Sequence, residues 1–176
     1  MPRLLLATAL CLATSLPALA FDASDRNAIT QEAAGFVRAV QDKNYDVFFD
    51  TVPPKMMRAL ASQSGVGVDA LEGQMETQIK KAMAPVVIDS FSMDVAAMQS
   101  GQTKAGRAYA TIPTTSVLEL PARGKLRRDD TTLALQDNAE WYLIRLDSPT
   151  QLRLLRKTYP DFQGITFPKA TEVVVQ

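Results

Sequence analysis

The spacing of apolar residues changes once along this chain, at Pro85, and this change limits the folds that the chain can adopt. Before Pro85, apolar residues recur every three or four positions, which is typical of one face of a helix. After Pro85 they alternate with polar residues, which is typical of half-buried strands. A helical first half followed by a strand-rich second half predicts one α+β domain, with helices packed on one face of an antiparallel sheet.

Three helices are predicted in the first half. The first covers residues 28–42 with Asp25 as its N-cap, and its apolar stripe consists of Ile29, Ala33, Phe36, Val37 and Val40. Residues 45–49 then form a short helix or turn. Pro54 opens the second long helix, because proline is tolerated in a first helical turn, and Asp69 caps the third.

Four strands are predicted in the second half. They cover residues 87–97, 107–118, 131–136 and 141–146, with polar loops or turns between them. This arrangement predicts an antiparallel meander. A last helix is expected over residues 149–159, and the tail at 171–175 either adds an edge strand or remains loose.

The first twenty residues have the pattern of a secretory signal peptide. Arg3 precedes an apolar run over residues 4–16, and Ala18-Leu19-Ala20 matches a small-residue cleavage site. The run is shorter than the roughly 20 apolar residues of a membrane span. We therefore expect cleavage after Ala20, no membrane span, and a single domain over residues 21–176 in the periplasm or outside the cell.

Composition narrows the chemistry of the predicted domain. Cys11, the only cysteine, lies in the leader, and the chain has no histidine. Thiol and histidine-based nucleophilic mechanisms are therefore excluded, and we expect neither a metal nor a cofactor. Lys and Arg number 19, as do Asp and Glu, so removal of Arg3 with the leader leaves a net charge of −1. This balance gives no electrostatic reason to expect nucleic acid as a partner.

Two segments carry a resemblance to a known family. Residues 28–60, AITQEAAGFVRAVQDKNYDVFFDTVPPKMMRAL, contain a helix, a polar link and a second helix. Residues 135–144, LQDNAEWYLI, contain a polar turn, Trp-Tyr and an apolar strand. These segments resemble the nuclear transport factor 2-like superfamily (NTF2-like, also SnoaL-like), which has the cystatin-type cone fold. The resemblance covers residues 28–147 and implies N-terminal helices on a curved antiparallel sheet of about four strands, with residues 148–176 as an extra C-terminal helix and tail.

The resemblance also implies a cavity at the wide end of the cone, which in many relatives holds a small apolar or amphipathic ligand. The candidates to line it here are Phe36, Tyr45, Phe49, Asp89, Phe91, Met93, Tyr109, Trp141 and Leu143. The alternative is that the aromatic and aliphatic members of this set simply fill the core.

Enzymatic chemistry without histidine is known on this fold. Ketosteroid isomerase uses a carboxylate base and acidic hydrogen-bond donors that face an apolar pocket. Asp89 is the candidate base here and Tyr109 the candidate donor. The resemblance places Phe36 closest to the position of the isomerase's key tyrosine, which argues against this mechanism. We therefore assign no catalytic residue.

The last predicted helix has a basic side formed by Arg153, Arg156 and Lys157, a candidate contact for an acidic protein partner or simply a solvated face.

Three functions remain open for a protein that we expect to be a monomer or homodimer. The first is a non-catalytic periplasmic binding module for a small apolar ligand or a protein partner. The others are a cofactor-free isomerase or lyase, and an immunity or inhibitor protein.

Overall fold

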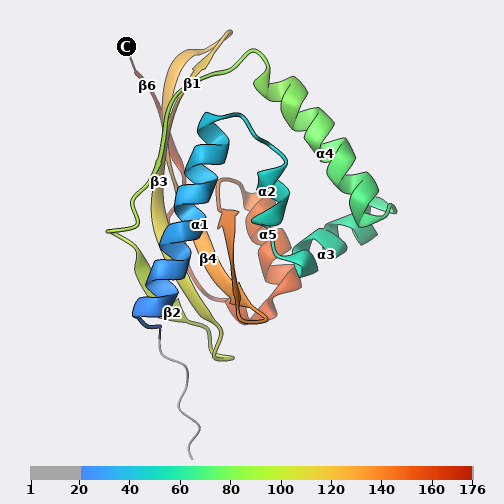
Figure 1. The fold of residues 1–176 in the computed structure, drawn as a ribbon, viewed down its shortest axis with the longest axis vertical. Coiled ribbons are helices and arrows are strands. Elements are labelled where there is room, and N and C mark those ends of the chain that lie inside the picture. The colour runs from blue at the N-terminus through green and yellow to red at the C-terminus, as the bar shows by residue number, and fades with distance from the viewer. Residues whose placement is uncertain (1–20, 176) are drawn as a thin grey trace, which may run out of the picture.

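A computed structural model describes residues 21–175 of the chain (Figure 1). Helices come first: α1 (Ala23–Gln41), α2 (Val47–Asp50), α3 (Pro54–Ser64) and α4 (Val68–Met83). The strands β1 (Val87–Met93), β2 (Gln99–Gln102), β3 (Ala108–Leu120), β4 (Gly124–Asp137) and β5 (Glu140–Arg145) follow. The chain ends with α5 (Pro149–Thr158), the short 3-10 helix η1 (Pro160–Phe162) and β6 (Thr171–Val174). This order confirms the predicted α+β class with an extra C-terminal helix. The predicted leader at residues 1–20 lies outside the described residues.

The long β3–β4 hairpin is the centre of the sheet. β1 and β2 pair one after the other along the free edge of β3, and β5 and β6 pair along the free edge of β4. All these pairings are antiparallel, and the sheet curls into a half-barrel beside α1 (Figure 1). The four strands of the main path follow the order of the predicted meander, but β1 ends at Met93 instead of residue 97, and β4 begins at Gly124 instead of residue 131. β2 lies partly in a segment predicted as a loop, because its polar, glycine-containing sequence lacks the alternating apolar residues of a half-buried strand.

Both faces of the sheet are covered by other elements. Neighbouring residues of a strand point in opposite directions, so each strand contributes side chains to both faces. Toward α1 it presents Ala110, Ile112 and Ala134, which pack with Ile29 and Phe36 of the helix. The opposite face buries the side chains of α5 and η1 in a second apolar cluster, whose members include Leu133, Leu135, Ile144, Leu155, Tyr159 and Phe162. The sequence predicted α5 but not the face of the sheet that it covers.

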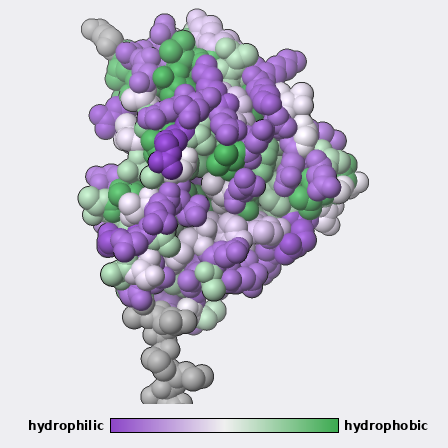
Figure 2. Space-filling view, in the orientation of Figure 1, coloured by the Kyte–Doolittle hydropathy of each residue, from purple (hydrophilic) through white to green (hydrophobic). Residues whose placement is uncertain are grey.

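β6 confirms the edge-strand alternative for the tail. It pairs with residues 126–129 of β4, and its four side chains are all exposed. Val173 and Val174 are 52% and 73% exposed. Figure 2 shows an apolar patch on an otherwise mostly hydrophilic surface in this region, close to the C-terminal end of the chain. β6 therefore extends the sheet through backbone hydrogen bonds without adding to the core.

Two helix starts differ from the sequence prediction. Asp22, rather than Asp25, is the N-cap of α1: its side chain accepts a hydrogen bond from the Asp25 amide (2.9 Å), and the Asp25 side chain accepts one from the Asp22 amide (3.0 Å). Asp25 is thus the second half of a capping box. Asp69 lies inside the first turn of α4, whose N-cap is Gly67. There it suits the positive end of the helix dipole.

No helix within residues 21–175 is long and apolar enough to cross a membrane.

Candidate functional site

A mainly apolar cavity of about 230 Å³ lies beside β5, at the end of the main path of the sheet. Its wall is built from α1, the α2–α3 region, α4, β5 and α5, and includes Phe36, Phe48, Met57, Leu60, Met75 and Leu143. Ile144 also lines it, although Leu143 and Ile144 belong to the apolar clusters of opposite sheet faces. The cavity therefore lies at the edge of the sheet and not between the sheet and α1.

One long-range hydrogen bond and two local sequence signals bring α3 and α4 over this edge. The backbone carbonyl of Thr51 accepts a hydrogen bond from the amide of Leu143 (2.8 Å), so the link between α2 and α3 covers the free edge of β5. Pro54 then starts α3, and Gly65 ends it in the left-handed conformation (φ 69°) that glycine adopts without strain. The chain reverses there and returns as α4, which supplies Met75 to the cavity wall.

The α1 face of the sheet also contains a buried polar strip. It consists of Thr114 and Ser116 on β3 and of Asp130 and Thr132 on β4, all of them buried. The hydroxyl oxygens of Thr114 and Thr132 lie 2.8 Å apart. The side chain of Asp130 is 1% exposed and forms ion pairs with Arg145 on β5 and, at 3.7 Å, with Arg128 on its own strand. This strip places an ionic cluster beside the apolar core.

Arg145 belongs both to this strip and to the cavity. Its Nη2 donates to the Asp130 carboxylate, and its guanidinium lies 5.4 Å from the centroid of the Phe91 ring. Its Nε is buried and has no hydrogen-bond partner in the structure. The same residue lines the apolar cavity, together with Gln151. The cavity wall therefore combines apolar surface with a cationic group.

Of the sequence-predicted lining residues, Phe36 and Leu143 line this cavity. Phe91, Met93 and Trp141 pack in the core under α1, and the Trp141 indole donates to Asp25 at 3.3 Å. These three side chains therefore pack against α1 and do not line this cavity.

Tyr45 and Phe49 lie near the cavity without lining it. The Tyr45 ring packs edge-on against Phe48, with 5.5 Å between the ring centroids. Phe49 packs against Met57 and Leu71 of the α3–α4 pair. Both residues support the helices that form the wall.

Asp89 and Tyr109 do not come together. Asp89 lies at an irregularity in the β1–β3 pairing and forms an ion pair with Lys125. Tyr109 lies near the start of β3, against β2, whereas β1 pairs with the end of β3. The Tyr109 ring packs on Phe162 of η1 (5.5 Å between centroids). The geometry thus gives no support to an acid–base pair formed by these two residues.

The basic residues of α5 differ in their environments. Arg153 and Lys157 are exposed, and Arg153 donates to the Thr150 hydroxyl (2.9 Å). Arg156 is half-buried and donates to the backbone carbonyl of Ile165 (2.7 Å). Leu155 is fully buried in the cluster between α5 and the sheet. The apolar side of α5 is thus used inside the molecule, which leaves two charges free for an external partner.

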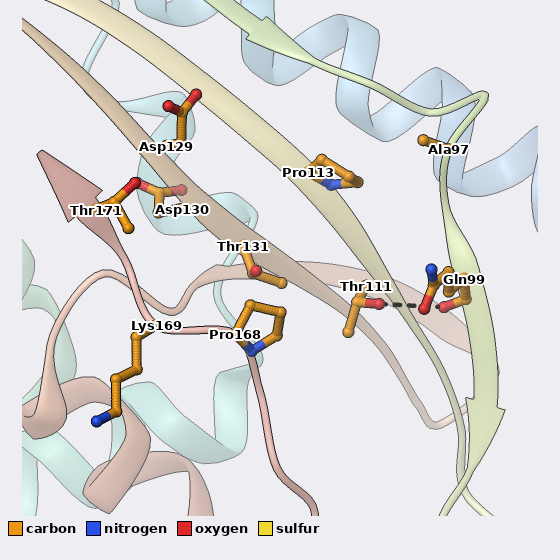
Figure 3. A pocket seen from close by; sticks show the side chains of 10 residues that line it. All are labelled: Ala97, Gln99, Thr111, Pro113, Asp129, Asp130, Thr131, Pro168, Lys169 and Thr171. Atoms are coloured by element: carbon orange, nitrogen blue, oxygen red, sulfur yellow. Dashed lines mark hydrogen bonds between the residues drawn. The ribbon is translucent and has the colours of Figure 1, made fainter. Parts of the chain in front are cut away.

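A second cavity, of about 240 Å³, lies between β2, β3, β4 and residues 168–171 (Figure 3). Its wall is more polar: the Thr111 hydroxyl there donates to the Gln99 carbonyl at 3.4 Å. Asp129 accepts hydrogen bonds from Thr115 (2.7 Å) and Arg127, which lower the pKa of its carboxyl below the usual value. Because both acids of this wall, Asp129 and Asp130, are engaged in ion pairs, we regard this cavity as the weaker candidate.

Among residues 21–175, no cluster of three or more acidic, histidine or cysteine side chains is arranged to hold a metal ion. Comparisons with protein-family models, curated proteins and solved structures find no match to this chain.

Sequence reasoning missed Arg145, although a signal was present. In the predicted strand 141–146, residues Trp141, Leu143 and Arg145 share one face, so an arginine follows two apolar residues on the inward side. A charge at such a position needs a buried partner or a ligand. Its partner Asp130 lies just before the predicted strand 131–136, where the strand pattern does not indicate the direction of its side chain.

Proposed function

We propose that this protein is an exported, non-catalytic binding module for a small apolar ligand, and that the cavity beside β5 is its binding site. The observation that carries the proposal is the cavity itself, about 230 Å³ and lined mainly by apolar side chains. Protein interiors are close-packed, with few voids larger than a water molecule. The cavity is partly open to the surface, and concave, mainly apolar pockets with a few polar groups are the usual sites of small molecules.

The methionines support this proposal. Met56, Met57 and Met75 all line the cavity. Methionine is unbranched and polarisable, so it adapts its conformation to ligands of different shape. A wall of this kind favours a ligand recognised by its apolar surface more than by a fixed pattern of hydrogen bonds.

Membership of the NTF2-like superfamily and export are part of the same proposal. The helix-first order and the half-barrel sheet beside α1 support the superfamily, which itself does not choose a function. The sequence pattern of the leader supports export. N-terminal sequencing of the protein recovered from the periplasm is expected to begin at Phe21, and a protein that retains the leader or stays in the cytosol contradicts export.

Native mass spectrometry of the protein, purified without denaturation, tests the binding function. We expect a bound mass that is released on unfolding and that identifies the ligand class. A protein that carries no small molecule, and that takes up none from a panel of apolar compounds, contradicts the proposal. That result would favour a protein partner that contacts Arg153 and Lys157.

A matched pair of variants assigns the ligand to this cavity. Met75 and Ile79 are both half-buried on α4, one turn apart, and Met75 lines the cavity whereas Ile79 does not. Met75→Trp is expected to fill the cavity and remove the bound mass, and Ile79→Trp is expected to retain it. Equal retention by both variants places the ligand elsewhere.

A further inference from the structure

Arg145 connects the apolar cavity to the buried polar strip through its ion pair with Asp130. Its side chain is 27% exposed, and its Nε–H is buried without an acceptor. Oδ1 of its partner Asp130 is also buried without a partner, so the exposed part of the Arg145 side chain, and not Nε, is what a ligand in the cavity can reach. The guanidinium also has a fixed, planar fork of donors that suits a carboxylate.

The charges around Arg145 are shared among several ion pairs. Asp130 is shared between Arg145 and Arg128. Glu172 lies 4.0 Å from Arg128 and also pairs with Arg123. Two arginines thus share the one buried carboxylate, Asp130, and Arg145 is the one of them that lines the apolar cavity. In such surroundings an anion is attracted more strongly than it is in bulk water.

We propose that the Arg145 guanidinium holds the carboxylate of the ligand and that the ligand is a small monocarboxylic acid with an apolar tail; this inference rests on the proposed binding function. The tail occupies the apolar space beside Met57, Leu60 and Met75. A volume of about 230 Å³ lies below the range of about 300–1,000 Å³ of pockets for drug-sized ligands, which favours a short acyl chain.

Octanoate and octan-1-ol separate the headgroup from the tail, because they have the same chain length and differ in charge. Isothermal titration of the purified protein is expected to show octanoate binding at least about tenfold more tightly than octan-1-ol, as a charge-assisted hydrogen bond predicts. Arg145→Gln is expected to weaken octanoate by about ten- to a hundredfold and to leave octan-1-ol nearly unchanged.

Two further variants separate a folding defect from loss of the headgroup contact. The double variant Asp130→Asn/Arg145→Gln removes both charges of the ion pair, so no carboxylate is left buried without its strongest partner. This variant is expected to remain folded and to lose the preference for octanoate. Arg127→Gln removes an exposed arginine of the same strand, β4, and is expected to keep the preference.

The outcomes distinguish the two proposals. Equal affinity for the two probes, or an octanoate preference that persists in folded Arg145→Gln, overturns the headgroup assignment and leaves the binding function standing. If neither probe binds the wild-type protein, the headgroup assignment is overturned, and the panel of apolar compounds then decides the proposed binding function separately.

Discussion

At the residue scale, Gly101 shows how a single missing side chain shapes the fold. It pairs with Tyr109 across β2 and β3, and a Cβ atom at this position would lie 2.5 Å from Cζ of the Tyr109 ring. The ring itself packs on Phe162. Glycine therefore lets the Tyr109 ring lie across β2 while it contacts the cluster under η1.

Gly101→Ala is expected to destabilise the protein by about 1–3 kcal/mol, because the new methyl group overlaps a packed ring. Urea denaturation measures the change. Gly73→Ala is the matched control: it lies inside α4 with open space around it, and it is expected to stabilise by about 0.5–1 kcal/mol. A Gly101→Ala protein as stable as wild type contradicts the contact, whereas recovery of stability on adding Tyr109→Ala supports it.

Tyr142 allows a test by pH. Its hydroxyl donates to the Glu140 carboxylate at 2.6 Å, which raises the pKa of Tyr142 from about 10 to about 12. The fold thus favours the protonated phenol. The stability that this provides is complete below pH 10 and is lost as the pH rises from about 10 to about 12.

The titration of Tyr142 is measured as the part of the phenolate absorbance that the wild-type protein shows and Tyr142→Phe lacks. It is expected to have its midpoint near pH 12 in the wild-type protein and at a lower pH in Glu140→Gln, because that variant weakens the hydrogen bond from the phenol and removes the charge that repels the phenolate. The same midpoint in the wild-type protein and in Glu140→Gln would contradict this effect of Glu140 on the pKa of Tyr142.

At the element scale, α5 and η1 are part of the core. Leu155, Tyr159 and Phe162 are fully buried. The Tyr159 hydroxyl donates to the Asp137 carboxylate (2.9 Å), and burial together with this bond raises the pKa of Tyr159. Arg107 connects Asp137 (3.2 Å) to Asp161 (2.9 Å) and thereby joins the end of β4 to η1.

Leu155→Ala is therefore expected to cost about 2–5 kcal/mol in the free energy of unfolding, the range for a truncated buried leucine. Arg153→Ala, on the exposed side of the same helix, is expected to stay within about 0.5 kcal/mol of wild type. Chemical denaturation of both variants makes the comparison. Similar small effects would mean that α5 is only loosely attached to the sheet.

At the scale of the whole molecule, β4 joins the two main apolar clusters. Ala134 belongs to the cluster under α1, and Leu133 and Leu135 belong to the cluster under α5 and η1. Loss of β4 from the sheet therefore exposes apolar side chains of both clusters. The described part of the chain therefore has the construction of one cooperative unit.

Calorimetry is expected to show a single unfolding transition, with a calorimetric enthalpy equal to the van't Hoff enthalpy. Addition of a reductant is expected to leave the transition unchanged, because Cys11 is the only cysteine of the chain. Two separate transitions would show that α5 and the tail unfold independently of the rest.

The sequence by itself determined the features that depend on near neighbours. The spacing of apolar residues identified the helices and most strands, because the helical and strand periods differ locally. Pro54 marked the start of α3, and Gly65 takes the left-handed backbone that ends the helix. Of the candidate lining residues, Phe36 and Leu143 line the cavity beside β5.

The tertiary structure decided everything that depends on which distant segments lie side by side. The bond between Thr51 and Leu143, which places the α2–α3 link over β5, joins residues far apart in the chain. The ion pair of Asp130 and Arg145 exists because β4 and β5 pair in one particular register. A local pattern contains neither the register nor the partner, so it indicated the residue types of the site without showing which of them meet.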